Sequence, residues 1–403
     1  MARRRGLLKR LAGATGVAGL AGCSALRRSD GADGEDGRDD GLPARQHAMN
    51  AHLRTDAAGN PLTPRHHAVL LFDLTAGPSS ATAETVETAM RTLESAYEWS
   101  SRGLFARLAW GTSYFSRVGA LGRSPIRRPR VLSRTDDPDL LAFDGALVLS
   151  SDVPSHVAAA EAAMFGSRAE LGGDPVAARL GDVAELAGRR TGFVGEGLPA
   201  AHADAEGVPA DAPLEDAPMF TGFFSGRRGT QASEERVTID DGRFAGGTTM
   251  HLSHLTESLG EWWNGLDDDG RVARMFSAAL SPSDVAELDA DVPTQDVRAN
   301  ARTHDVVGHF EKVARARRDG DPVILRRDFN TVDGGQAGVH FLSLQASLDD
   351  FVRTRKAMNG WWLRDDSDAV TDRENNGLLN FVTVRSRANF YLPPRNDRAL
   401  PLR

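Results

Sequence analysis

The sequence predicts an α+β protein built from two ferredoxin-like halves, each with the element order βαββαβ. Strand-like and helix-like segments follow most of this order between residues 67 and 165, and the order recurs between residues 246 and 392. Between them, residues 195–217 are rich in Gly, Pro, Ala and Asp, which predicts a long surface loop. We therefore expect one half over residues 45–215 and the other over residues 216–403.

The elements of the first half are predicted from its hydrophobic patterns. Apolar runs at residues 67–74 and 145–150 have the length of strands, and residues 104–111 alternate as a strand does. Apolar residues at helical spacing predict a helix over residues 81–97, and a second helix is expected over residues 156–165. Together these segments supply most of one βαββαβ unit.

The second half repeats this order with longer connections. Turn residues at 331–336 predict a hairpin between two of its strands. The predicted elements are a strand over 246–255, a helix over 256–266, paired strands over 323–327 and 338–345, a helix over 348–358 and a strand over 380–392.

Composition narrows the class of protein. The chain has 403 residues, of which 40% are hydrophobic and 26% charged, and its mean hydropathy is −0.36. These values exclude a polytopic membrane protein and a globally disordered chain. Acidic residues outnumber basic ones by 56 to 48, giving a net charge of −8, which disfavours binding to nucleic acid phosphates.

The first 23 residues have the pattern of an export signal. Three arginines at residues 3–5 precede a short apolar stretch, and residues 20–23 read Leu-Ala-Gly-Cys, which resembles a bacterial lipobox. We expect export by the twin-arginine route and anchoring at the outer face of the cell membrane through lipidated Cys23. Residues 24–44 are polar and predict a disordered tether. Because Cys23 is the only cysteine, an intrachain disulfide is excluded.

Several motifs occur in an order typical of one known family. Residues 222–226 read Gly-Phe-Phe-Ser-Gly, and residues 246–255 form a Gly-Gly strand followed by Trp262. His309 opens the segment His-Phe-Glu-Lys-Val-Ala-Arg-Ala-Arg, and the strands at 324–327 and 338–345 follow it. In this order the chain resembles the dye-decolourising (DyP-type) haem peroxidases, including the deferrochelatase-like proteins. The resemblance implies the fold of the dimeric α+β barrel superfamily and a haem b cofactor.

The resemblance also implies the residues that hold the haem. His309 lies where the family has its proximal iron ligand, and its second ring nitrogen is expected to donate to a carboxylate. Gly222 and Gly226 lie in the loop whose backbone passes over the haem in this family. Arg317, or Arg315 beside it, could pair with a haem propionate, although both could equally solvate a helix end.

The implied distal side departs from the family pattern at Ser225, where the family has an aspartate. Arg326 lies where the family has its distal arginine, which stabilises the charge that builds as peroxide is cleaved. A serine hydroxyl cannot accept a proton at neutral pH as a carboxylate base can. Three readings stay open: Arg326 acts with water, Glu234 or Glu235 replaces the missing acid, or the protein binds haem with little peroxidase chemistry.

Other polar residues carry weaker hypotheses. His251 and His254 are three residues apart in a strand and so face opposite sides, which disfavours a shared metal site with His340. Residues 45–47, Arg-Gln-His, lie where the family's N-terminal arm approaches the haem, but most simply begin the first half.

The sequence is best interpreted as that of a haem-dependent peroxidase that oxidises an unidentified reductant in one-electron steps. Hydrogen peroxide, an electron donor and the membrane are its expected partners, nucleic acid is not, and homo-oligomerisation is left open. A haem-binding lipoprotein with little peroxidase activity, or a haem-free module that retains the fold, are the alternatives.

Overall fold

The computed structural model describes residues 41–288, 296–370, 373 and 375–403. Residues Leu42–Arg403 form one compact unit. The predicted signal, with Cys23, and most of the predicted tether lie outside the described residues. The compact unit begins three residues before the expected start at residue 45: Leu42 packs near Trp99, and the Ala44 carbonyl accepts a hydrogen bond from the Arg395 amide at 2.8 Å. None of the described helices is long and apolar enough to cross a membrane.

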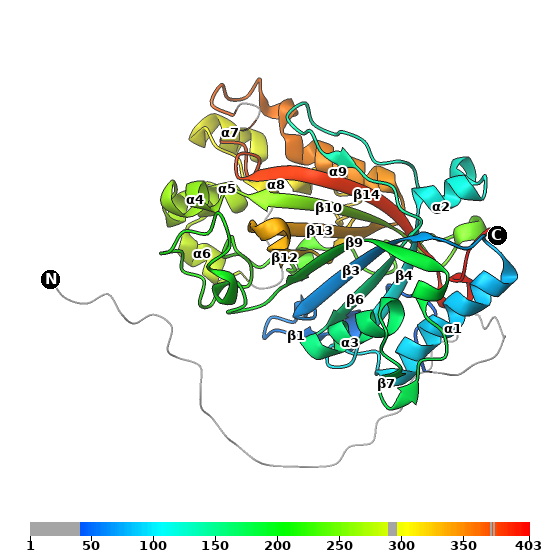
Figure 1. Ribbon diagram of the computed structural model, residues 1–403. Coiled ribbons are helices and arrows are strands. Elements are labelled where there is room, and N and C mark those ends of the chain that lie inside the picture. The colour runs from blue at the N-terminus through cyan, green and yellow to red at the C-terminus, as the bar shows by residue number, and fades with distance from the viewer. Residues whose placement is uncertain (1–40, 289–295, 371–372, 374) are drawn as a thin grey trace, which may run out of the picture. The chain divides into compact units, whose positions relative to one another are not determined.

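The predicted α+β class with two βαββαβ halves is confirmed (Figure 1). The first half contains β3 (His66–Leu74), α1 (Ser80–Ala96), β4 (Phe105–Gly111), α2 (Thr112–Arg117), β6 (Gly145–Ser151), α3 (Pro154–Phe165) and β9 (Ala184–Phe193). Short strands accompany them: β1 (Arg54–Thr55), β2 (Pro61–Leu62), β5 (Asp139–Leu140), β7 (Glu170–Leu171) and β8 (Asp174–Pro175).

The second half follows the same order, with additional helices before its second strand. Its elements are β10 (Thr248–Glu257), α4 (Leu259–Asn264), α5 (Asp268–Met275), α6 (Pro282–Ala286), α7 (Val297–His304), α8 (His309–Ala314), β11 (Leu325–Arg326), β12 (Phe329–Thr331), β13 (Gly338–Gln345), α9 (Leu348–Asn359) and β14 (Val382–Leu392).

The long strands of both halves join into one closed barrel. Hydrogen bonds link them in the order β10-β13-β12-β9-β3-β6-β4-β14, and β14 pairs with β10 again to complete the ring. One seam between the halves joins β9 to β12 at Phe193 and Asn330. This seam needs Gly192, because a Cβ at that position would lie 1.8 Å from the Asn330 carbonyl oxygen. The other seam joins β4 to β14.

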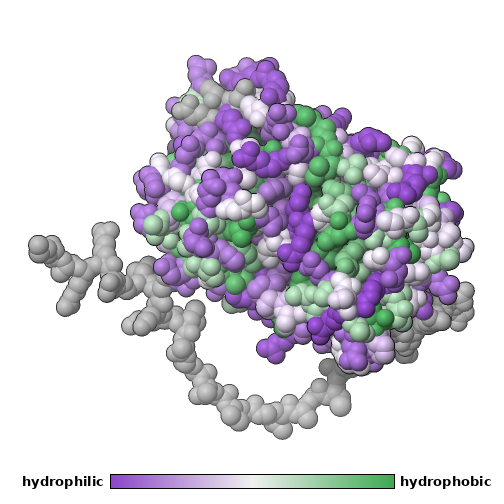
Figure 2. Space-filling view, in the orientation of Figure 1, coloured by the Kyte–Doolittle hydropathy of each residue, from purple (hydrophilic) through white to green (hydrophobic). Residues whose placement is uncertain are grey.

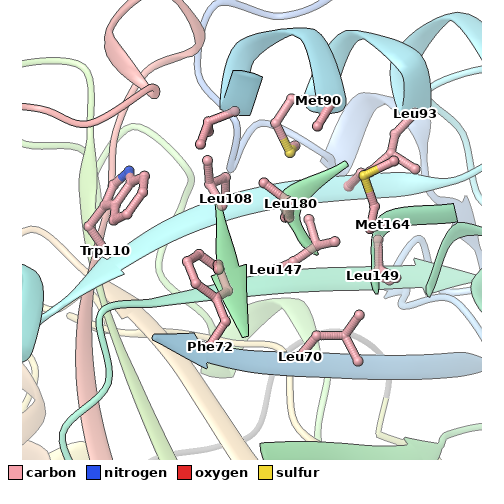
Figure 3. Packing of buried hydrophobic residues seen from close by; sticks show 14 of the residues in the cluster. Leu70, Phe72, Met90, Leu93, Leu108, Trp110, Leu147, Leu149, Met164 and Leu180 are labelled. Atoms are coloured by element: carbon pink, nitrogen blue, oxygen red, sulfur yellow. The ribbon is translucent and has the colours of Figure 1, made fainter. Parts of the chain in front are cut away.

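Alternation along the strands separates two layers of core. Side chains such as Val69, Leu71 and Leu252 point into the barrel and form its apolar interior. In the first half, Leu70 and Phe72 point outward instead and pack under α1 and α3 with Met90 and other apolar residues (Figure 3). The face in Figure 2 is mostly hydrophilic, with smaller hydrophobic groups between.

Several predicted boundaries needed correction. β10 continues to Glu257, so the helix expected over residues 256–266 is shorter and spans Leu259–Asn264. The strand expected over 323–327 is shorter and spans Leu325–Arg326 as β11. β12 follows outside the expected range, at Phe329–Thr331, and keeps the register of β11 against β13. The last strand of the first half, β9, had no sequence prediction. The hairpin at residues 331–336 does connect β12 to β13.

Candidate functional site

A cavity lies between the outer face of the second half's sheet and the helices that cover it. Its floor is formed by outward-pointing residues of β10, β13 and β14, including Leu255, Phe341 and Val384, and α8, α9 and the loop around Ser225 form its walls. The cavity has an empty volume of ≈ 1750 Å³, counting its open mouth, and its lining is mainly apolar. Its size and composition suit a large, mostly apolar ligand that carries a few polar groups.

His309 is the first residue of α8 and lies in the wall of this cavity. The start of α8 is fixed because the Glu311 carboxylate accepts a hydrogen bond from the Gly308 amide at 2.9 Å and another from Asn300. Position 308 must be glycine, since a Cβ there would lie 1.7 Å from the Phe276 carbonyl oxygen. The backbone around His309 therefore leaves the imidazole little choice of position.

The His309 ring has a buried Nδ1 without a hydrogen-bond partner among the described residues. The nearby Glu311 carboxylate is engaged in capping α8, so the carboxylate expected behind this ring is not found among the described residues. Burial, followed by the charges of Lys312 and Arg326, lowers the pKa of His309 to about 3. The imidazole is therefore neutral at physiological pH, which is the form that binds a metal ion.

Arg326, on β11, and Ser225, in the long connection between β9 and β10, also line the cavity. The Arg326 guanidinium donates to the Ser225 carbonyl at 2.6 Å and to the Thr230 hydroxyl at 2.8 Å, so it holds this loop in place. The Arg326 amide donates to the Gln231 side chain at 2.9 Å. The structure thus brings His309, Arg326 and Ser225, predicted from distant parts of the sequence, to one cavity.

The Ser225 hydroxyl donates a hydrogen bond of 2.9 Å to the carboxylate of Asp328. Asp328 lies two residues after Arg326, lines the same cavity and is largely buried. The sequence analysis missed this residue, although an acidic residue in a core segment directly after two arginines was a signal. The cavity therefore contains a carboxylate beside position 225 despite the serine.

The two glutamates considered as substitutes lie elsewhere. Glu234 is buried and accepts hydrogen bonds from the amides of Met49 and Asn50 at 2.6 and 2.8 Å, which ties down the N-terminal arm. Glu235 pairs with Arg45 at 3.5 Å, where its side chain is exposed. Neither residue lines the cavity, so in this conformation neither is placed to replace the missing acid.

A second cationic group lies where β14 meets the floor. Arg387 and Arg355 share the Asp136 carboxylate, each donating to its Oδ2 at 2.8 Å. Arg387 is 2% exposed, and its Nε and Nη1 are buried without partners among the described residues. Burial lowers the pKa of Arg387 to about 10, so it keeps its charge at neutral pH. One carboxylate for two guanidinium groups leaves a net positive charge that can bind an anionic group.

The other residues predicted to bind the cofactor have different surroundings. Arg317 lines the cavity and donates to the carbonyls of Gly229 and Gly320 at 2.7 and 3.0 Å. Arg315 lies over the ring of Trp362. Gly222 has a φ of +85°, which favours glycine, and lies in the turn that leads to Ser225.

Gly226 lines a neighbouring cavity instead of the large one. Residues 45–47 contact both halves: Gln46 donates to the Leu108 and Pro393 carbonyls, and His47 bonds the Thr238 hydroxyl. His251 bonds Asn389 and Ser253, whereas His254 lies against His340. Across the described part of the chain, no three or more His, Cys, Asp and Glu side chains gather as a metal site would require.

Glu257, at the end of β10, is a further residue that sequence reasoning missed. It lines the cavity, is 5% exposed, and its Oε2 has no partner among the described residues. Burial raises its pKa to about 8. The carboxyl group is therefore mostly protonated at neutral pH and can donate a hydrogen bond to a ligand.

Comparison with known proteins agrees with this architecture. A family model described as a family of unknown function, DUF7405, matches residues 64–394. Curated proteins gave no match.

Solved structures with similar folds include a DyP-type peroxidase from Cellulomonas bogoriensis, with 16% identity, a TM-score of 0.55, and 88% of this chain and 96% of that chain covered. A variant of DypB from Rhodococcus jostii in complex with heme has 14% identity, a TM-score of 0.54, and coverage of 88% and 99%. A dye-decolorizing protein from V. cholerae has 15% identity, a TM-score of 0.51, and coverage of 87% and 99%. The chain therefore has the fold of the DyP-type peroxidases.

Proposed function

This chain belongs to the family of unknown function DUF7405, and we propose that it is a haem-dependent peroxidase that oxidises an unidentified reductant. The observation that carries the proposal is one cavity lined by a neutral histidine and a buried arginine, each with ring or guanidinium nitrogens that lack partners among the described residues, and by a distal-type arginine joined to a carboxylate through Ser225. A similar fold was solved in complex with heme. We propose haem b as the ligand.

The residues of the cavity fit this cofactor. His309 would hold the iron, since its ring is neutral and its Nδ1 is orphaned. Arg387 would hold a propionate, because its Nε and Nη1 lack partners among the described residues and because Arg387 and Arg355 together carry more charge than Asp136. The apolar floor around Leu255 and Phe341 would cover the macrocycle. Haem would supply the cleavage of hydrogen peroxide to water, with two electrons returned by the reductant.

The chain's own residues would then transfer a proton between the two peroxide oxygens and stabilise the negative charge that develops. Asp328 would take a proton from the near peroxide oxygen and return it to the far one, as a positioned carboxylate can. Ser225 would orient Asp328 through its 2.9 Å hydrogen bond. Arg326 would stabilise negative charge, and its bonds to Ser225 and Thr230 hold it without reorganisation.

The first test is titration of the purified chain with haemin, followed by absorbance. We expect a Soret band that saturates at one haem per chain, is lost in His309→Ala and is unchanged in His304→Ala, an exposed histidine of α7. No saturable band, or an unchanged band in His309→Ala, would overturn the proposal.

One observation favours a second function, a haem-binding protein with little peroxidase activity. Position 225 carries a hydroxyl instead of an acid, and the Asp328 carboxylate is engaged by that hydroxyl. Mixing the haem-loaded protein with hydrogen peroxide in a stopped-flow spectrometer separates the two functions. A Soret change within milliseconds supports the peroxidase, whereas a band that persists for minutes supports the binding protein.

We also propose that the chain is exported and anchored through Cys23. The support is the sequence of residues 1–23, which combines arginines, an apolar stretch and a lipobox-like end. Expressed in a bacterium with twin-arginine export, the chain should fractionate with membranes, and Cys23→Ala should move it to the soluble extracytoplasmic fraction. Membrane association that survives Cys23→Ala would contradict the anchor.

A further inference from the structure

A second cavity lies behind the distal wall of the proposed haem cavity. Ser225, Arg326 and Asp328 line both cavities, so these side chains form the partition between them. The second cavity has an empty volume of ≈ 790 Å³, counting its mouth, and lies between the loop after Phe224, the β11 segment and the N-terminal arm at Asn50. Fifteen of the described residues line it, among them Thr63, Gln231 and Arg327, and a cavity of this extent suits a small ligand.

The lining of this second cavity is strongly cationic. Its lining includes three arginines, Arg228, Arg326 and Arg327. Among the described residues that line it, Asp328 is the only acidic one. Arg327 is 4% exposed and lies 3.5 Å from Glu234, but that carboxylate already accepts two backbone amides of the N-terminal arm. Positive charge therefore exceeds negative charge in a region that is largely shielded from water.

A further arginine adds to this excess from inside the barrel. Arg107, on β4, is 2% exposed, and its Nε and Nη1 are buried without partners among the described residues. Burial, followed by the charge of Arg327, lowers the pKa of Arg107 to about 9, so the Arg107 guanidinium remains charged at neutral pH. A buried guanidinium without an anion is costly, which favours an anion close by.

Donors for such an anion are available in the cavity itself. The Nε of Arg327 is buried without a partner in the described part of the chain, while its Nη2 donates to Asn50 at 2.6 Å. The Arg228 side chain is exposed at the mouth, and its amide donates to Asn60 at 2.8 Å, which fixes its backbone. One buried and one exposed guanidinium can bind the same oxygen atoms from two sides.

We infer that this second cavity binds a small oxyanion, either a short carboxylate or an inorganic oxyanion, against the back of the distal wall. An anion there would contact the same residues that face the proposed haem cavity. Its binding would therefore change the charge felt by Arg326 and Asp328. The binding step itself uses no haem, so it can be tested whether or not the proposed peroxidase activity is confirmed.

The test is calorimetric titration of the full chain, purified without haem at low ionic strength, with acetate, formate, nitrate or phosphate. We expect saturable one-to-one binding of at least one of these anions. Tighter binding of acetate and formate would assign a carboxylate ligand, and tighter binding of nitrate or phosphate would assign an inorganic one.

Variants make the assignment specific to this cavity. Arg228→Gln should weaken binding about tenfold, because it removes one charged donor at an exposed position that packing does not need. Arg102→Gln, an exposed arginine elsewhere, makes the same change in net charge and should leave binding unchanged. Thr63→Phe should fill the cavity and abolish binding. The inference is overturned if no anion saturates, if Arg102→Gln weakens binding equally, or if Thr63→Phe has no effect.

Discussion

The two halves share one frame but use the outer faces of their sheets differently. In the first half, outward residues such as Leu70 and Phe72 are apolar and pack directly under α1 and α3 (Figure 3). In the second half, the equivalent outward positions of β10 include Ser253, Leu255 and Glu257, and they face a cavity. The difference shows that the βαββαβ frame supplies stability in one copy and a binding site in the other, depending on what covers the sheet.

The largest effect is expected from removing the carboxylate of Asp328, which lines the cavity of the second half. Asp328→Asn should slow the reaction of the haem-loaded protein with hydrogen peroxide by about a hundredfold to ten-thousandfold, because the amide cannot take the proton. The measurement is the stopped-flow rate of the Soret change. Haemin affinity should stay within a few-fold of wild type, and an unchanged rate would exclude Asp328 as the proton acceptor.

Packing in the two halves can be compared directly with a pair of phenylalanines. Phe72→Ala should cost about 3–5 kcal/mol of unfolding free energy, because it empties a closed core beside Trp110. Phe341→Ala, at the cavity floor, should cost about 1–2 kcal/mol, since one side of that ring already faces open space. Urea unfolding of the haem-free protein measures both. Equal costs would mean that the second half is as closely packed as the first.

Glu257 provides a pH-dependent test of the same contrast. Its pKa is raised from 4.5 to about 8, so the folded protein holds this proton more tightly than the unfolded chain does. The associated stability is fully present below pH 4.5 and is lost as the pH rises through 8. Glu257→Gln should remove this slope and stabilise the haem-free protein by about 3 kcal/mol at pH 7. The check is unfolding free energy between pH 5 and 8; parallel curves for both proteins would contradict it.

A smaller effect is expected from the arginine at the floor. Arg387→Met should weaken haemin binding about tenfold to a hundredfold, since it removes a charged donor for a propionate but keeps an apolar stem. Arg353→Met, on the exposed side of α9, is the matched control and should bind haemin normally. Comparable losses in both variants would point to general electrostatics instead of a propionate site.

The sequence predicted much of the frame because the periodic strands and helices are local features. The strand over 338–345 and the helix start at residue 348 match β13 and α9. β9 was missed because its outward face is largely exposed and lacks a simple apolar run. Helices α5–α8 are short, so their hydrophobic periodicity spans too few turns to be recognised.

The site was predictable only where a motif marked it. The motif marked His309, Arg326 and Ser225, and the fold brings them to one cavity. Asp328, Arg387 and Glu257 were missed because their significance depends on contacts between segments far apart in the sequence. The Ser225–Asp328 bond, for example, joins residues that are 103 positions apart.

The closed barrel sets an order on biosynthesis. β14 completes the ring by pairing with both β4 and β10, and it follows every other strand of the ring along the chain. A ribosome must therefore release β14 before the ring can close, and a chain that stops earlier leaves strand edges open to aggregation. Under the proposed export of the folded chain, the position of this one strand would therefore decide whether a chain is complete enough to be transported.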